Sequence, residues 1–320
     1  MEGVSAYAFK LISLSFCLPA LAIFHVCSRI SEYNTCTNMV IKSPAKINLA
    51  LQITGKRDDG YHLLRMVNLP LALHDVIEIE TLPYYNDTYV TCDEMRLVGL
   101  RSNLCTKAVD ALRARCGFKN HFMIHIHKEI PFAAGLGGGS SNAAVVLIAL
   151  NHILKLGLSE EELCEIALPL GSDIPFFIKG RPALAEGIGD QLTPIYPKNA
   201  YHCLLVKPEK GLSTKDVYLR CDDFERLSID IDNVVKGLEE GDDALVAASF
   251  GNDLFPASTA LLPEVKDVVD MLRKDGFPLS AMSGSGSCCF ALSLDNKKIK
   301  AEERKLAKLG YDVILTETKK

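Results

Sequence analysis

The 320-residue chain has no tryptophan, no Cys-x-x-Cys pair and no cluster of lysines and arginines. The missing tryptophan excludes little. The missing basic cluster, together with a formal net charge of −5, argues against general nucleic-acid binding. The eleven cysteines are odd in number and irregularly spaced, so we expect reduced thiols in a cytoplasmic protein.

Several nucleotide-binding signatures are also missing. Gly55-Lys56 is followed by Arg57, so no Walker A loop is completed. The His-Arg-Asp and Asp-Phe-Gly signatures of protein kinases are absent, and no dinucleotide fingerprint opens a plain βαβ unit. We therefore do not expect a P-loop, protein-kinase or Rossmann fold.

Metal-binding patterns are weak. His125-x-His127 lacks cysteine or acidic partners at the spacing of zinc ligands. Two histidines that are two residues apart on a strand share one face, so they could bind a metal ion, but we favour a solvent-facing pair. The sequence predicts no metal ligand.

Residues 1–38 differ from the rest of the chain. The stretch 11–26 is mostly apolar but shorter than a membrane span. No Ala-x-Ala cleavage site of a signal peptide follows it. A transit peptide would be rich in arginine, but Arg29 is the only arginine within 1–38. We expect no membrane association. We interpret Met39 as the true start and expect the extension 1–38 to lie outside the fold.

The chain does contain a glycine-rich run, PFAAGLGGGSSNAA at 131–144. It follows a strand-like segment, 122–126, and precedes a helix-like segment, 143–154. A glycine-rich turn that opens a helix presents free backbone N–H groups at the positive end of the helix dipole. Such a turn can cradle phosphates, because absent side chains let the backbone approach them closely. A flexible linker is the alternative, but a linker would not be fixed between a strand and a strong helix.

Phosphoryl transfer needs more than a phosphate cradle. It also needs a cation, a group that takes the hydroxyl proton and a pocket for the acceptor. Candidates for these roles stand in four short motifs: SPAKINL at 43–49, GKRDDGYH at 55–62, LGSDIP at 170–175 and GIGD at 187–190. A second glycine-rich turn, SGSGS, follows at 283–287.

Local patterns predict a mixture of strands and helices. In the first part we expect a strand, a turn at Ser43-Pro44 and a second strand over 41–54, followed by two strands within 63–80. We then expect a helix over 103–116 and a helix from the Ser159 and Glu162 capping box to about 168. A turn with a short strand is expected over 169–178. After a composition change near 197–199 we expect a strand at 204–206, helices at 234–250 and 262–274, strands flanking 283–287 and a last strand at 313–316.

These motifs resemble those of the galactokinase, homoserine, mevalonate and phosphomevalonate (GHMP) kinase superfamily. The run 131–144 is similar to its central phosphate-binding motif, and 283–287 is similar to its C-terminal glycine motif. SPAKINL followed by GKRxDGYH is similar to one branch, whose members phosphorylate 4-diphosphocytidyl-2-C-methyl-D-erythritol in non-mevalonate isoprenoid biosynthesis. The similarity runs from about Met39 to the C-terminus.

The resemblance implies an α+β fold of two domains with an active-site cleft between them. Residues 39–198 would form the N-terminal ATP-binding domain, and 199–320 the C-terminal domain. The implied reaction transfers the ATP γ-phosphate, with Mg²⁺, to the carbon-2 hydroxyl of the cytidylyl substrate. A small molecule is the expected partner, and a monomer or weak homodimer is the expected state.

The resemblance also implies roles for motif residues. Asp173 would be the catalytic base, and Lys46 would keep it ionised and polarise the reacting oxygens. Asn48 would position the substrate, while Tyr61 and His62 would hold the cytosine by stacking and hydrogen bonds.

Further roles follow for the nucleotide-binding surfaces. Tyr218 would stack on the opposite face of the cytosine, and Asn103 would touch the adenine. Asn142 stands where many relatives have aspartate, and asparagine can still cap the helix. The residues expected to bind ATP around its phosphates are Pro131, Ala133, Ala134, Gly135, Leu136, Gly137, Gly138, Gly139, Ser140 and Ser141.

Two alternatives remain. A kinase of the same superfamily with another acceptor alcohol would be favoured by loss of the Tyr61-His62 pair, which is present. A non-enzymatic, metabolite-responsive regulator would be favoured by loss of Lys46 or Asp173, and both are present.

A chain shortened to begin at Met39 is expected to be soluble, fully active and as heat-stable as the full chain. The full chain is expected to be less soluble, because 11–26 would leave an apolar stretch with no core to enter. Mass spectrometry of the native N-terminus tests this directly. A mature N-terminus at Met1, with activity lost in the shortened chain, would overturn the interpretation.

Overall fold

The computed structural model describes residues 38–83, 85–93 and 103–320. The expectation about the extension therefore lies outside the described residues, apart from Asn38, which begins the first strand. Within the described residues, no helix is both long and apolar enough to cross a membrane.

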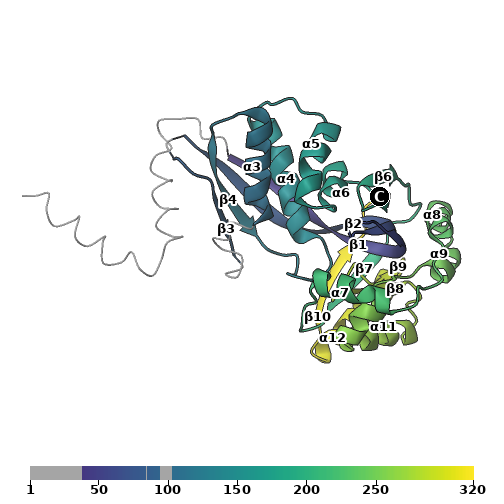
Figure 1. Ribbon diagram of the computed structural model, residues 1–320. Helices are drawn as coiled ribbons and strands as arrows, with labels where there is room; N and C mark the ends of the chain where they lie inside the picture. Colours follow the sequence, from purple (N-terminus) through teal and green to yellow (C-terminus); the bar gives the residue numbers. More distant parts are fainter. Residues whose placement is uncertain (1–37, 84, 94–102) are drawn as a thin grey trace, which may run out of the picture.

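The first part of the chain forms a sheet with helices beside it (Figure 1). Its elements are β1 (Asn38–Lys56), β2 (His62–Leu82), β3 (Tyr89–Cys92), α3 (Leu104–Cys116), β4 (His121–His127), α4 (Gly138–Ile153), α5 (Glu160–Ala167), α6 (Ile174–Lys179), β5 (Ala183–Gly187) and β6 (Gln191–Pro194). The strand order is β3-β4-β2-β5-β6, with β1 paired to β2. The β3–β4 pair is parallel, and the other pairs are antiparallel.

The second part forms a four-stranded antiparallel sheet in the order β10-β7-β9-β8. Its elements are β7 (His202–Lys207), α7 (Thr214–Arg220), α8 (Ile231–Glu240), α9 (Asp243–Ser249), α10 (Phe255–Leu261), α11 (Glu264–Lys274), β8 (Ser280–Met282), β9 (Cys289–Ser293), α12 (Asn296–Lys308) and β10 (Asp312–Glu317). The predicted α+β class with two domains is confirmed.

The long β1–β2 ribbon joins the two domains. Ile47 and Leu69 of this ribbon belong to the same buried cluster as Phe290 of β9. Farther along the ribbon, Leu51 shares a second buried cluster with Leu204 of β7. Because burial of apolar surface drives both clusters, the ribbon holds the two sheets in one fixed arrangement.

The predicted turn at Ser43-Pro44 is wrong. β1 runs unbroken through these residues, and its register with β2 shifts between Pro44 and Lys46, which faces Pro70. Proline has no N–H for the ladder, so it is tolerated at such a bulge. The freed backbone N–H of Lys46 donates to the Leu136 carbonyl instead, at 3.0 Å. The two strands expected within 63–80 are likewise one strand, β2.

The short strand expected within 169–178 is also wrong, because this segment contains the helix α6. Pro175 stands in its first turn, where proline is tolerated, and Gly180 ends it in the left-handed conformation with φ 63°. A short apolar run cannot be assigned to a strand or a buried helix by periodicity alone. The helix expected over 234–250 is two helices, because Gly241 with φ 75° ends α8.

Asp253 is expected to be important for stability. Its side chain is 2 % exposed, and its carboxylate accepts from the backbone N–H of Ile53 and of Leu227, both at 2.8 Å. Asp253→Ala would leave these donors unpaired and should lower the free energy of unfolding by about 2–3 kcal/mol in urea denaturation. The control Asp270→Ala removes an exposed carboxylate of α11 and should cost less than about 0.5 kcal/mol. Equal losses in the two variants would contradict this account.

Candidate active site

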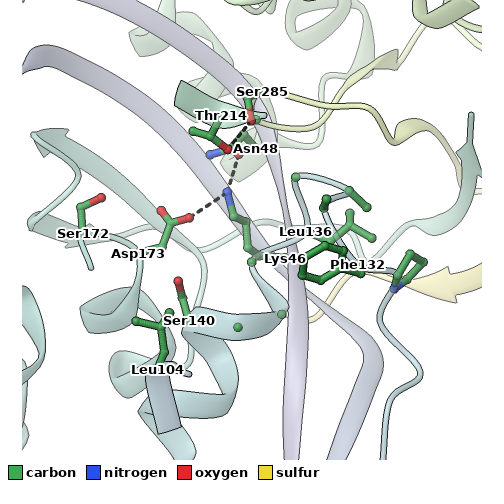
Figure 2. Close-up of a pocket in the computed structure, with 18 of the residues that line it drawn as sticks. Lys46, Asn48, Leu104, Phe132, Leu136, Ser140, Ser172, Asp173, Thr214 and Ser285 are labelled. Carbon is green, nitrogen blue, oxygen red and sulfur yellow. Dashed lines mark hydrogen bonds and ion pairs between the residues drawn. The ribbon is translucent and has the colours of Figure 1, made fainter. Parts of the chain in front are cut away.

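A cavity of about 580 Å³ lies between the two domains. Volumes of this order are typical of small-molecule sites. The N-terminal domain contributes the glycine-rich segment 131–140 to its wall, and the C-terminal domain contributes Thr214, Tyr218, Leu254, Gly284 and Ser285. Figure 2 shows the side chains that converge on it.

The glycine-rich loop has a backbone that only glycine can provide. Gly135 and Gly137 have φ of 74° and 72°. A Cβ at Gly135 would lie 2.1 Å from the Ser283 carbonyl oxygen, and one at Gly137 would lie 2.6 Å from the Phe177 ring. Gly137 is also the N-cap of α4 and offers no side-chain cap. The first backbone N–H groups of α4 therefore receive no side-chain hydrogen bond from the N-cap, and they lie beside the cavity. A helix N-terminus of this kind can bind anions.

Lys46 of β1 lines the cavity. Its side chain is only 4 % exposed. The Nζ atom donates to Asn48 Oδ1 at 2.5 Å and lies 3.5 Å from Asp173 Oδ2 (Figure 2). Lys46 and Asn48 are two residues apart on β1, so their side chains point to the same face. A nearly buried ammonium is thus held between an amide oxygen and a carboxylate.

A hydrogen-bond network fixes Asn48. Its Nδ2 donates to Asn68 Oδ1 at 2.6 Å, so its Oδ1 is turned toward Lys46. Its backbone N–H donates to Ser283 Oγ at 3.2 Å, and Ser283 Oγ donates to the Gly135 carbonyl at 2.9 Å. The orientation of the ammonium therefore depends on both domains.

Asp173 directly precedes α6 and makes no capping bond to it. Its side chain is 33 % exposed, and Figure 2 shows the carboxylate pointing toward Lys46. Because α6 is a helix rather than a strand, Asp173 stands at a helix entrance beside Ser172, and both line the cavity. The carboxylate is thus accessible to a ligand and is held close to a cation.

Other sequence-predicted residues have mixed outcomes. Asn103 caps α3, accepting from the Cys105 N–H at 2.9 Å, and also lines the cavity. Ser141 is fully buried, is not among the lining residues, and lies 2.8 Å from Ser43 Oγ. Asn142 does not cap the helix, because Gly137 holds that position. Asn142 Oδ1 instead accepts from Ser43 Oγ at 2.7 Å.

The residues expected to hold the cytosine are only partly brought together. Tyr218 lines the cavity, and its ring centroid is 5.4 Å from that of His62, with the planes tilted by 36°. Burial raises the pKa of the Tyr218 hydroxyl, and the negative charge of Asp173 adds to this. Tyr61 is 64 % exposed, and neither Tyr61 nor His62 lines the cavity itself.

Asp222 contacts His62 outside the cavity, a pairing that sequence reasoning missed. Its carboxylate lies 3.0 Å from His62 Nε2 and accepts from Lys56 Nζ and Arg226 Nη2, both at 2.7 Å. The hydrogen bond from Lys56, aided by His62 and Arg226, holds the pKa of the Asp222 carboxyl well below its usual range. His62 and Lys56 lie 160 and 166 positions from Asp222, so no local pattern could pair them with it.

Lys128 was missed as well. It lines the cavity, and its Nζ lies 2.5 Å from Asp75 Oδ2, whose residue is fully buried. Asp75 also accepts from the backbone N–H groups of Glu129 and Ile130. A second fixed cation therefore faces the glycine-rich loop, and the only sequence signal for it is its place just before that loop.

Comparison with known proteins agrees with this geometry. The GHMP kinases N terminal domain matches residues 103–181, and GHMP kinases C terminal matches residues 234–312. A 4-diphosphocytidyl-2-C-methyl-D-erythritol kinase from Geobacter sp. (strain M21) is 41% identical over 268 residues, covering 83% of this chain and 93% of the relative. The chain belongs to the 4-diphosphocytidyl-2-C-methyl-D-erythritol kinase family. A member from Clostridium botulinum (strain Hall / ATCC 3502 / NCTC 13319 / Type A) is 38% identical over 282 residues, covering 88% of this chain and 100% of the relative.

Solved structures extend the comparison. The crystal structure of a 4-(cytidine 5'-diphospho)-2C-methyl-D-erythritol kinase superimposes with a TM-score of 0.73 at 28% identity, covering 88% of this chain and 100% of that chain. A homoserine kinase from Cytophaga hutchinsonii gives a TM-score of 0.71 at 16% identity, covering 89% and 96%. The second likeness shows the shared fold alone. The predicted family and its small-molecule kinase activity are confirmed.

Gly135→Ala is expected to damage the fold as well as the cavity. The new methyl group would meet the Ser283 carbonyl, and the positive φ would be strained, so stability should fall by at least about 2 kcal/mol. Gly139→Ala is the matched control, because the nearest atom to its Cβ is Leu104 Cδ1 at 3.8 Å. That change lies in α4 and should keep stability or raise it by up to about 1 kcal/mol. Thermal melts of both proteins without nucleotide test this, and similar melting temperatures would contradict it.

Proposed function

We propose that this chain transfers the γ-phosphate of ATP to the carbon-2 hydroxyl of 4-diphosphocytidyl-2-C-methyl-D-erythritol. The observation that carries the proposal is the pairing of Lys46 with Asp173 at 3.5 Å beside the glycine-rich loop. Phosphoryl transfer depends mainly on positioning and charge stabilisation, and this wall offers both. Membership of the family supplies the acceptor.

In this proposal the loop residues Gly135 to Ser140 hold the ATP phosphates with backbone N–H groups, and Lys128 adds a cation. The fit is supported by the N-terminus of α4, where Gly137 is the N-cap and has no side chain to occupy the first backbone N–H groups. An oxygen ligand suited to Mg²⁺ is present in the Ser140 hydroxyl, which lines the cavity. Mg²⁺, when bound, neutralises charge on the nucleotide phosphates.

Asp173 accepts the proton of the acceptor hydroxyl as that oxygen attacks the γ-phosphorus. The Lys46 ammonium stays beside the carboxylate and stabilises the negative charge that develops on the transferred oxygens. Asn48 keeps the ammonium in place, and it is itself fixed by Asn68 and Ser283. Asn103 contacts the adenine from the start of α3.

For the cytosine we propose that Asp222 sets the tautomer of His62. A carboxylate at Nε2 favours the proton on that nitrogen, so the neutral ring keeps Nδ1 as an acceptor. Cytosine offers its 4-amino group as a donor, whereas uracil has a carbonyl there. Tyr61 and Tyr218 contribute aromatic faces for stacking.

The proposal also covers the domain boundary, the location and the partners of the chain. We place the domain boundary between 198 and 199, which is supported by the last strand of the first sheet ending at Pro194 and the second sheet beginning at His202. A cytoplasmic location is supported by free thiols at Cys105, Cys116, Cys164, Cys203, Cys221, Cys288 and Cys289. Absence of nucleic-acid binding fits the net charge of −5. For the oligomeric state we propose a monomer or weak homodimer.

The proposal is tested by an ADP-release assay with purified protein on a panel of acceptors. The panel contains the cytidylyl methylerythritol, its uridylyl analogue, homoserine and mevalonate. The cytidylyl compound should have the highest kcat/KM. A higher value for homoserine or mevalonate would favour another kinase of the superfamily, and no ADP release with any acceptor would favour a regulator.

Asp173→Asn is expected to fold normally and to lose activity. General-base and orientation effects are worth ~10²–10⁴-fold, so kcat should fall by that factor while the Kd of ATP changes little. Asp267→Asn, an exposed carboxylate on α11, is the matched control and should retain full activity. An Asp173→Asn variant with more than about a tenth of wild-type turnover would rule out the proposed role.

Asp222→Asn is expected to weaken base recognition. An amide can donate or accept, so it no longer fixes the His62 tautomer. The preference for the cytidylyl over the uridylyl substrate should drop by about tenfold, the worth of one neutral hydrogen bond. Asp223→Asn is the control, because its side chain is exposed next to Asp222. Equal weakening of ATP and substrate binding would indicate damage to the fold instead.

A further inference from the structure

A cluster of titratable side chains lies outside the cavity, on the sheet face opposite the helices. The alternate residues Phe122, Ile124 and Ile126 of β4 are buried in the core with the helices. His125 and His127 therefore share the other face. The cluster is completed by Asp93, which directly follows β3, the strand paired in parallel with β4.

The sequence has no acidic residue at ligand spacing from the two histidines, but the fold brings Asp93 beside them. Asp93 Oδ1 lies 3.0 Å from His125 Nε2, and Asp93 Oδ2 lies 3.2 Å from His127 Nδ1. The three ligand atoms all lie within 4.8 Å of one another. Ligands about 2.0–2.2 Å from a tetrahedral metal ion are separated by about 3.3–3.5 Å, so a small relaxation would admit an ion.

The far nitrogen of each histidine is also occupied. His125 Nδ1 lies 2.7 Å from Thr91 Oγ1, a hydroxyl that can donate to this nitrogen or accept from it. In the metal-free chain Nε2 donates to the Asp93 carboxylate, which can only accept. A bound metal ion would replace that proton, and Nδ1 would then carry the ring proton and donate it to Thr91. His127 Nε2 lies 3.3 Å from Glu78 Oε1, so Glu78 could hold this outer nitrogen while Nδ1 binds an ion in place of its proton. Metal-binding histidines have this pattern, with the outer nitrogen bound to a carboxylate or another acceptor.

We propose that Asp93, His125 and His127 form a site for a borderline divalent transition-metal ion such as Zn²⁺. Two imidazoles and one carboxylate are typical ligands for such ions, and they leave room for water. Glu78 adds a second negative charge behind His127. This replaces the sequence expectation of a solvent-facing pair without a metal.

A second cluster, His62 with Cys221 and Asp222, is a poorer candidate. Asp222 already binds two cations, Lys56 and Arg226, which repel a metal ion. Burial raises the pKa of the Cys221 thiol, and Asp222 adds to this, so the thiol stays protonated. Among the described residues, the ion pairs of Asp93 are with the two histidines alone.

The site would have a structural role. β3 is a strand of four residues at the sheet edge, and it pairs only with β4 among the described strands. An ion held by Asp93 and the two histidines would clamp the end of β3 to β4. None of the three residues lines the cavity, so kinase activity should not require the ion.

The test is a calorimetric titration of the full chain, freed of metal by a chelator, with ZnCl₂. His127→Asn should remove one bound Zn²⁺ per chain, and Glu78→Gln should weaken that site by about 10–100-fold. His121→Asn is the matched control, because it lies on the same strand and the same face but outside the cluster. It should bind as many ions as the wild type. Melting temperatures measured without metal should be alike for all variants.

Two further readouts decide the assignment. Zn²⁺ should raise the melting temperature of the wild type and of His121→Asn, but not that of His127→Asn, because binding to the folded state stabilises it. Cys221→Ser should leave the number of bound ions unchanged. The proposal is overturned if His127→Asn binds as many ions as the wild type, or if the bound ion is lost in Cys221→Ser. An unchanged ADP-release rate in His127→Asn separates this outcome from any failure of the proposed kinase function.

Discussion

The contact between Gly135 and Ser283 is the constraint on which the site depends. The Gly135 backbone lies so close to the Ser283 carbonyl that no side chain fits between them. The Ser283 hydroxyl links the strand that carries Lys46 to the glycine-rich loop, because it accepts from the Asn48 N–H and donates to the Gly135 carbonyl. One hydroxyl of the C-terminal domain thus sets the distance between the glycine-rich loop and the Lys46–Asp173 pair of the N-terminal domain.

This arrangement explains how a nearly buried lysine can be kept charged. Burial of an ammonium is costly unless it is paired and hydrogen-bonded. Lys46 has both kinds of partner, a carboxylate at 3.5 Å and an amide oxygen at 2.5 Å. The bulge in β1 places it there, since the freed Lys46 N–H binds the loop at Leu136. The bulge in β1, the position of the glycine-rich loop and the position of the Lys46 ammonium are therefore linked. Together they hold the site in place without a ligand.

Features with local causes could be predicted from the sequence. The capping box at Ser159 forms as expected, with both of its hydrogen bonds present, and the helix over 103–116 is capped by Asn103. The glycine-rich run joins a strand to a helix, as its flanking periodicities indicated. In each case the residues that decide the structure lie within a few positions of one another.

Features that depend on distant residues could not be predicted. The unbroken β1 requires the partner strand β2, and the helical state of α6 depends on its burial in the core. Asp222 meets His62 across 160 positions, and Asp93 meets His125 across 32. Residue roles came from the family resemblance, because a lone lysine in a strand carries no functional signal of its own.

The most direct measurement is a crystal structure of the chain with a non-hydrolysable ATP analogue and 4-diphosphocytidyl-2-C-methyl-D-erythritol. The account predicts that the acceptor hydroxyl oxygen lies within about 3.2 Å of an Asp173 carboxylate oxygen, or one water away. It also predicts the γ-phosphate at the glycine-rich loop and the cytosine at His62. A complex in which the acceptor hydroxyl lies out of reach of Asp173 and Lys46, with the cytosine bound elsewhere, would contradict it.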